Sequence, residues 1–171
     1  MARNNDRRDD EYDDNVIDIS RVSKVTKGGR NLRFRVLVAA GNYEGKVGVG
    51  SGNTGEIPQA IGQAVRDAKK HIIEVPIING TIPHEVVGKF KAGEVVLKPA
   101  HRGTGVIAGD VVGTICRLAG LDNILTKSLG TNNPMTLAKA VIEGFSSLKT
   151  PESVAERRGK DVEDIEEAFQ G

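Results

Sequence analysis

Hydrophobic and polar residues alternate in short runs along the first third of the chain. The clearest run spans residues 32–40, where apolar side chains are separated by Arg33 and Arg35. A period of two is typical of a strand with one buried face. Similar runs occur at 16–25 and 46–49, and the segments between the runs are rich in glycine and asparagine. The pattern predicts three strands joined by short turns, in an antiparallel meander.

After these strands the spacing of hydrophobic residues changes to three or four. Pro58 opens the segment, and polar residues separate the apolar ones, which are Ala60, Ile61, Ala64, Val65, Ala68, Ile72 and Ile73. This spacing predicts a helix with one apolar face. We expect the helix to end near Glu74. Residues 15–78 therefore predict a first domain with the order β-β-β-α.

The second half of the chain predicts another small domain. Prolines and glycines interrupt residues 75–92, which indicates a connection with short strands. Beyond it, hydrophobic spacing and the cap sequence Asn132-Asn133-Pro134 predict two strands and two helices, at 93–99, 110–119, 124–128 and 134–148. We expect β-α-β-α for residues 79–150. The fold class is then α+β, with two small α/β domains.

Both ends of the chain are acidic. Residues 1–14 carry three positive and six negative charges and almost no apolar side chains, so we expect a disordered arm. Residues 151–171 indicate an acidic helical tail. Pro151 opens a short helix there, and a second helical turn is expected around 162–169.

The net charge of +1 conceals a basic block. Residues 15–35 carry six positive charges and one negative charge. Such a block is a footprint for an anionic partner, although a solvated charged face gives the same pattern. No apolar run approaches the ~20 residues that span a bilayer, and residues 1–14 lack the hydrophobic stretch of a secretory signal. We expect a soluble, cytoplasmic protein without a membrane segment.

The cysteine and the histidines offer little chemistry. Cys116 is the only cysteine and lies in an apolar run, so we expect a buried thiol and no intrachain disulfide. His71, His84 and His101 have no Cys, His or carboxylate cluster at ligand spacing. The sequence therefore predicts no metal site and no cofactor.

Two glycine-rich segments are candidate phosphate sites. Residues 50–55 match G-x-G-x-x-G between a strand and a helix, as in dinucleotide enzymes. The preceding strand belongs to a meander, which argues against a cofactor; the amides there could instead meet an RNA phosphate. Residues 98–109 are similar to the phosphate loop of sugar kinases, but Asp110 is the only carboxylate nearby. We expect the protein not to be an enzyme, with a small-molecule phosphotransferase as the weaker alternative.

The basic block gives the strongest signal from residues alone. Arg33 and Arg35 lie two apart on one strand face, and three further cations surround a glycine pair in the turn: Lys24, Lys27 and Arg30. A hairpin with a glycine tip flanked by cations can enter a groove and contact phosphates. The loop has no aromatic residue, and Phe34 alternates towards the core. The pattern predicts recognition of RNA shape and backbone more than of base sequence.

Seven segments, in order along residues 16–165, resemble the bacterial branch of the universal S-five family of small-subunit ribosomal proteins. They are RVSKVTKGGR at 21–30, GKVGVG at 45–50, EIPQAI at 56–61, NGTIPH at 79–84, GTGVIAG at 103–109, AGLDNIL at 119–125 and AERRGK at 155–160. Several ordered motifs are far more specific than any single one.

The resemblance implies a first domain similar to double-stranded-RNA-binding domains and a second similar to a unit found in certain kinases. It implies a structural role on the ribosome, contacts with small-subunit rRNA, with ribosomal proteins number four and number eight, and with mRNA near its entry channel. It also implies support of subunit assembly and decoding accuracy, and a turn at 24–30 near the rRNA helix that binds spectinomycin. A free-standing double-stranded-RNA-binding regulator remains an alternative.

The residues expected to bind rRNA combine the basic hairpin with polar positions in the other loops and strands. They are Arg21, Lys24, Lys27, Gly28, Gly29, Arg30, Arg33, Arg35, Gly52, Asn53, Lys69, Lys70, Lys98, Arg102, Thr104, Lys127, Asn132 and Asn133.

The chain departs from the family pattern in two places. Asn53 stands where the family usually has a lysine, which weakens a phosphate contact there or transfers it to backbone amides. His101 and Arg102 stand where many members have small or acidic residues, which changes the local partner geometry.

Overall fold

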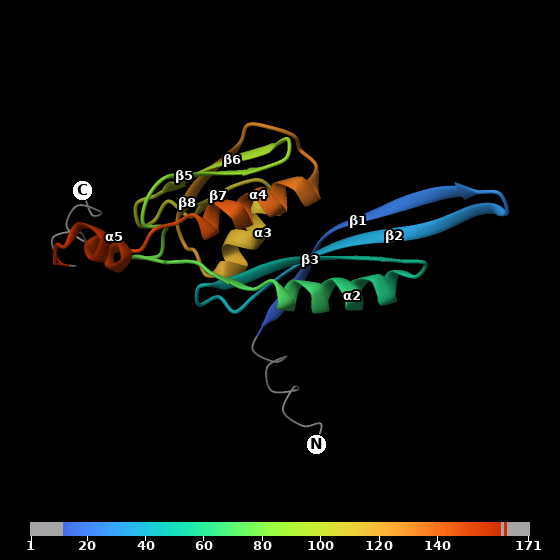
Figure 1. Ribbon diagram of the computed structural model, residues 1–171, viewed down its shortest axis with the longest axis horizontal. Coiled ribbons are helices and arrows are strands. Elements are labelled where there is room, and N and C mark those ends of the chain that lie inside the picture. Colours follow the sequence, from blue (N-terminus) through green and yellow to red (C-terminus); the bar gives the residue numbers. More distant parts are fainter. Residues whose placement is uncertain (1–11, 162, 164–171) are drawn as a thin grey trace, which may run out of the picture.

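Two four-stranded sheets and four helices form the structure, which is a computed structural model that describes residues 12–161 and 163. Figure 1 shows the first sheet with a long hairpin that extends to one side, and the second sheet above it with its own helices. The expected fold class, α+β with two small α/β domains, is confirmed.

The first sheet is an antiparallel meander with the order β1-β2-β3-β4. Its elements are β1 (Asp13–Thr26), β2 (Gly29–Gly41), β3 (Lys46–Thr54), the helix α2 (Ile57–Lys70) and the short β4 (Ile73–Glu74). The three predicted strands are confirmed. The helix ends at Lys70, four residues before the expected end, because Ile73 and Glu74 leave it to pair with β3.

Strand β3 lies unusually close to α2, and its glycines make this possible. Gly48, Gly50 and Gly52 alternate on the face beneath the helix, and a Cβ on any of them would collide with the helix backbone. The helix faces these glycines with alanines at a spacing of four, all of them fully buried: Ala60, Ala64 and Ala68. The G-x-G-x-x-G segment therefore lies largely in a strand, whereas we expected a loop that leads into the helix.

The second sheet has the order β5-β6-β8-β7, with β7 and β8 parallel and the other pairs antiparallel. Its elements are β5 (Val86–Phe90), β6 (Gly93–Pro99), β7 (Val106–Ile107), α3 (Asp110–Ala119), β8 (Ile124–Ser128) and α4 (Pro134–Ser146). The predicted β-α-β-α units are confirmed at 93–99, 110–119 and 124–128. Residues 75–92 contribute β5, a full strand of this sheet. Gly88 repeats the close-packing device, since a Cβ there would collide with Ala140 O on α4.

The two sheets share one hydrophobic core. Helix α3 packs against β1, β2 and β3 of the first sheet as well as against α4. The backbone is joined there by hydrogen bonds from Tyr43 N to Leu118 O at 2.9 Å and from Gly45 N to Ala119 O at 2.8 Å. The largest buried cluster accordingly contains Leu37 and Val47 from the first sheet together with Ile115 of α3 and Phe145 of α4.

The ends of the chain differ partly from expectation. Strand β1 begins at Asp13, so residues 13 and 14 pair with Gly41 and Ala40 and are not part of an arm. The hydroxyl of Tyr43 hydrogen-bonds to the Asp13 carboxylate, which raises the pKa of Tyr43. Helix α5 (Pro151–Arg158) confirms the helix opened by Pro151. The remainder of the expected arm, residues 1–11, and nearly all of the expected turn at 162–169 lie outside the described residues.

The packing predicts that the glycines of the G-x-G-x-x-G segment differ in how well they tolerate a Cβ. We expect Gly50→Ala and Gly52→Ala each to destabilise the protein by about 1–3 kcal/mol or more, because the new methyl group overpacks the helix interface. Gly55→Ala has open space around its Cβ and should change the stability by about 0.5 kcal/mol or less. Urea unfolding monitored by circular dichroism measures all three. Equal losses would mean that close helix packing is not why these positions are glycine.

Candidate nucleic-acid interface

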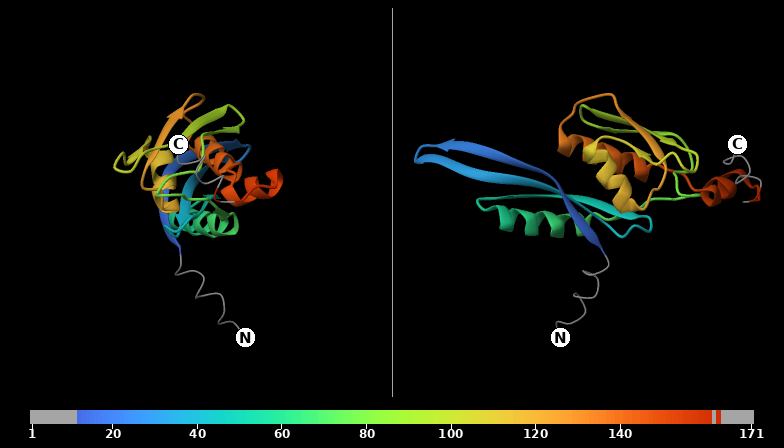
Figure 2. Two further views of the ribbon diagram at one scale, coloured as in Figure 1. Left: turned by 90° about the vertical axis from the view of Figure 1, so that its left-hand side faces the viewer. Right: turned by 180° about the vertical axis from the view of Figure 1, so that it is seen from behind.

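The most prominent feature of the surface is the ribbon formed by β1 and β2. Pairing with β3 stops at Phe34 and Thr54, so beyond that point the ribbon has only two strands. Figures 1 and 2 show it extending past the ends of β3 and α2. An isolated two-stranded hairpin is only marginally stable in water. This ribbon is anchored at its base by the rest of the first sheet, and its distal part extends beyond β3 as two strands.

The tip of the ribbon is a bare two-residue turn. Thr26 pairs with Gly29, so Lys27 and Gly28 form the loop. Gly29 has φ of +128°, a conformation that favours glycine, and nothing lies within 4 Å of a Cβ built on Gly28 or Gly29. The side chain of Lys27 is exposed. The predicted glycine tip is thus open to a close approach by another molecule.

Strand register separates the side chains of the ribbon onto two faces. Ser20 pairs with Arg35, and Val22 pairs with Arg33. Directly opposite residues share a face, so both exposed arginines lie on one side, as their spacing predicted. Arg33 also donates from Nη2 to Asn53 O at 3.4 Å.

Phe34 and Arg21 pair on the other face of the ribbon. The Arg21 guanidinium lies 5.9 Å from the centre of the Phe34 ring, within the range of a cation–π contact. Phe34 is only half-buried, so its expected position towards the core is reached only in part.

The base of the arginine face meets the second domain. A small cavity there is lined by Asp18, Ser20, Arg35, Leu37, Asn133, Pro134 and Met135. Two candidates from distant parts of the sequence, Arg35 and Asn133, are brought together in this way. Asn133 Oδ1 accepts a hydrogen bond from Met135 N at 3.2 Å, which confirms the predicted cap of α4. The side-chain oxygen of Asn133 is therefore already in use.

The segment 50–55 does not form a phosphate cradle. Ser51 N donates to Asp67 Oδ2 at 3.0 Å, and Asn53 N donates to Gln63 Oε1 at 2.8 Å. Gly52 is buried beneath α2, so this structure does not expose it for the expected contact with RNA. The Asn53 amide, which was expected to be among those that take over the contact of the missing lysine, is already bonded to Gln63. Only the exposed side chain of Asn53 is available.

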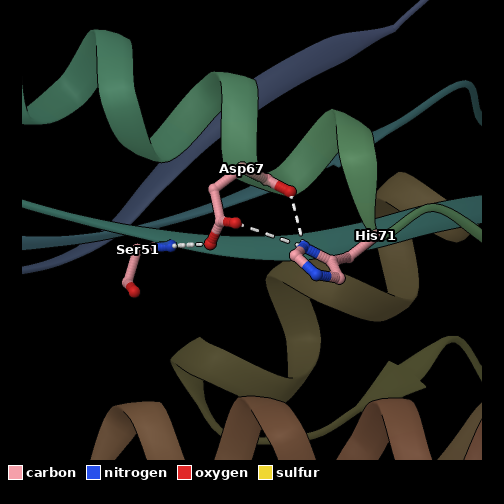
Figure 3. A network of polar contacts seen from close by, with 3 residues as sticks. All are labelled: Ser51, Asp67 and His71. Carbon is pink, nitrogen blue, oxygen red and sulfur yellow. Dashed lines mark hydrogen bonds and ion pairs between the residues drawn. The ribbon is translucent and has the colours of Figure 1, made fainter.

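Ser51, Asp67 and His71 form a polar network that has the composition of a catalytic triad but not its geometry (Figure 3). His71 Nδ1 lies 3.3 Å from Asp67 Oδ1 and 2.8 Å from Asp67 O. Ser51 joins only through its backbone amide, and its hydroxyl points away from the imidazole ring. A serine nucleophile needs a hydrogen bond from its hydroxyl to the base. The network instead ties β3 to α2.

The second glycine-rich loop is organised by a residue that the sequence did not single out. Asn123 is 5% exposed, and its Oδ1 accepts hydrogen bonds from Gly103 N at 3.1 Å and Gly105 N at 2.9 Å. These amides are consequently unavailable to a phosphate. Arg102 and Thr104 remain exposed at the rim. The signal that could have found Asn123 is its place beside Asp122 at the turn between α3 and β8.

The other candidates lie apart from the ribbon. Lys69 and Lys70 occupy the last turn of α2, where cations complement the helix dipole. Lys98 and Lys127 are exposed on β6 and β8, on the face of the second sheet that α3 and α4 leave open. Asn132 is exposed just before α4. The eighteen predicted residues thus do not form one site: they fall into a ribbon group, a second-domain group, and four residues on β3 and α2 of the first domain.

Outside these groups, the described residues form neither an exposed thiol nor a metal-binding cluster. Cys116 is fully buried, as predicted, and burial raises the pKa of its thiol to about 12. Within residues 12–161 and 163, no group of three or more His, Cys, Asp or Glu side chains could hold a metal ion. None of the helices in that part of the chain has the length and apolar character needed to cross a membrane.

The fold and the ribbon define a two-domain α+β protein with a basic, protruding hairpin. Comparison with protein families gives a matching result for each half. The family model for the N-terminal domain of ribosomal protein S5 matches residues 12–76, and the model for its C-terminal domain matches residues 88–158. The chain belongs to the ribosomal protein S5 family, as the resemblance of its motifs indicated.

Similar proteins cover almost the whole chain. The small ribosomal subunit protein uS5 of Thermotoga neapolitana is 54% identical over 156 residues, which are 91% of this chain and 88% of that protein. The uS5 protein of Thermotoga maritima is 53% identical over the same shares of the two chains.

Proposed function

We propose that this chain is a structural component of the small ribosomal subunit, bound to the ribosome in the cytoplasm. The observation that carries the proposal is the 54% identity over 91% of the chain to a protein named as a small-subunit component. We further propose, from the resemblance alone, contacts with ribosomal proteins number four and number eight and with mRNA near its entry channel. Roles in subunit assembly and decoding accuracy belong to the same proposal.

The ribbon is proposed as the main contact of the first domain with rRNA. Residues 19–35 contain six cations and no carboxylate, so a polyanion gains from every contact along this segment. The open glycine tip lets a sugar–phosphate backbone approach closely. A contact made mainly through phosphates reads the shape of the RNA more than its sequence.

The second-domain group is proposed as a separate, smaller rRNA contact. Lys98 and Lys127 lie on one open sheet face, and Arg102 lies at the rim of the loop that Asn123 holds. Asn132 and Thr104 add exposed polar groups. Two separate contacts suit a protein that joins neighbouring parts of a folded RNA.

Co-sedimentation tests the ribosomal role. Small subunits reconstituted without their own copy should take up the purified chain and retain it through a high-salt wash, because an integral component is held by many contacts at once. A free-standing RNA-binding regulator or a phosphotransferase would remain in the soluble fraction. Loss of the chain from the washed subunits would contradict the proposal.

Replacement of Lys24, Lys27 and Arg30 together by alanine tests the ribbon. Each phosphate contact adds roughly 0.7–0.9 to the slope of log affinity against log salt, so the triple variant should lower that slope by about two. The measurement is a salt titration of binding to a small-subunit rRNA fragment, with circular dichroism to confirm the fold.

Arg33→Ala with Arg35→Ala is the matched control, and we expect it to weaken binding less than the triple variant. Both arginines lie nearer the base of the ribbon, where Arg33 bonds to Asn53 and Arg35 borders the second domain. An unchanged slope in a folded triple variant would mean that the main phosphate contact does not lie at the turn.

We also expect the purified chain to have no phosphotransfer activity. The matched families are ribosomal proteins, the amides of both glycine-rich segments are largely engaged, and Asp110 has no acidic partner in the second loop. The purified chain should not turn over ATP. Turnover that disappears in Asp110→Ala would overturn this part of the proposal.

A further inference from the structure

The face of the ribbon opposite Arg33 and Arg35 carries an exposed apolar stripe. Ile19 is 47% exposed, Val25 76% and Leu32 44%. Ile19 pairs with Val36, Ser23 with Leu32, and Arg21 with Phe34, so alternation along β1 and β2 puts the three apolar residues on the face shared with Phe34. We call this set (Ile19, Val25, Leu32) the stripe.

The first domain does not cover this stripe. Val36 and Val38, on the same face, are buried beneath Ala60 and Ala64 of α2. The helix begins only at Ile57, and β3 ends where Thr54 pairs with Phe34. Further out, the same alternation continues, and the described residues leave its apolar side chains exposed. A protruding ribbon with three exposed aliphatic side chains is a surface that a partner covers.

Charge identifies the chemistry of that partner. No carboxylate occurs between Ile19 and Arg35, whereas six cations do. An apolar protein surface would leave those cations without a counter-charge, whereas RNA supplies phosphates beside apolar ribose. Ser23, which is exposed, and Arg21 share the face with the stripe. Methyl groups, the Ser23 hydroxyl and the Arg21 guanidinium suit ribose C–H groups, 2′-hydroxyls and base edges.

We propose that the stripe packs in the minor groove of an rRNA helix, against its ribose rings. This inference rests on the proposed function and specifies the groove. The major groove of an RNA helix is too deep and narrow for side chains, whereas the minor groove is wide and shallow and displays 2′-hydroxyls. Stacking on unpaired bases is disfavoured, because the only aromatic ring on this face, Phe34, already lies beneath Arg21.

The two contacts of the ribbon then differ in their response to salt. Cations at the turn bind phosphates and release counterions, which sets the salt slope. The stripe contributes by removing apolar surface from water, which carries no charge. Loss of the stripe should lower the affinity at every salt concentration and leave the slope unchanged.

The test uses the full chain with Val25→Ser and Leu32→Ser combined. We expect roughly tenfold weaker binding to the small-subunit rRNA fragment, since two apolar contacts are lost, at an unchanged salt slope. Val16→Ser with Tyr43→Ser is the matched control, because those residues are 40% and 53% exposed at the end of the first sheet that lies away from the turn, and it should bind as the parent does. The single variant Val25→Ser, at the most exposed position, guards against a folding defect.

A chemically modified RNA identifies the groove. Full 2′-O-methylation keeps the RNA helix in its form but fills the minor groove with methyl groups. The parent chain should lose affinity for the modified fragment, and the stripe variant should lose much less, because it has already lost that contact. An equal loss in both chains would overturn the minor-groove assignment.

Three other outcomes would also overturn it. Parental affinity in the folded stripe variant would mean that RNA does not touch the stripe. A reduced slope would mean that the loss acts through phosphates. Normal RNA binding with failed uptake into small subunits would mean that a protein covers the stripe. The proposed function fails differently, through a parent chain that does not bind the fragment or through an unchanged slope in the Lys24, Lys27 and Arg30 variant.

Discussion

The structure depends on the burial of five consecutive residues of β2 on both faces of the sheet. Residues 36–40 are 0–3% exposed. Val36 and Val38 pack beneath α2, whereas Leu37 and Ala39 join the core shared with α3 and α4. A strand that is buried on both sides cannot twist or slide without losing apolar contacts on one of them. This fixed segment lets the remainder of the same strand project into solvent as a ribbon, because the base supplies the stability that a lone hairpin lacks.

Glycine serves mainly to bring backbones together in this protein. On β3 it admits the alanine face of α2, and on β5 Gly88 does the same for α4. The segment that resembles a dinucleotide loop is therefore a packing motif, and its amides bond to Asp67 and Gln63. The similarity to phosphate loops arises because both uses need a backbone without a Cβ in the way. In a phosphate loop the group that approaches the glycine is a phosphate, whereas in this protein it is the backbone of a helix, including its carbonyl oxygens.

The two faces of the ribbon differ in chemistry, since one carries arginines and the other carries exposed aliphatic side chains. Register places Arg33 and Arg35 on one side and the stripe on the other, with an open glycine turn at the end. An RNA helix offers both kinds of partner within a short distance, phosphates along its strands and ribose in its shallow groove. A single hairpin can thus combine a salt-dependent anchor with a salt-independent contact. The charge block of the sequence described only the first of these.

The sequence by itself determined the fold class, most strands and helices, the basic turn and the family, because these follow from hydrophobic period, local charge and motif order. It also gave the Asn133 cap and the burial of Cys116. Only the tertiary structure showed the burial of Gly52, the engaged amides at 50–55, the role of Asn123 and the separation of the eighteen candidates into distinct groups. Each depends on which distant backbone lies opposite. The alternation at 32–40 showed that the strand has two faces. Only the packing of α2 and α3 decided that both faces are covered at 36–40 and that the strand is exposed nearer the turn.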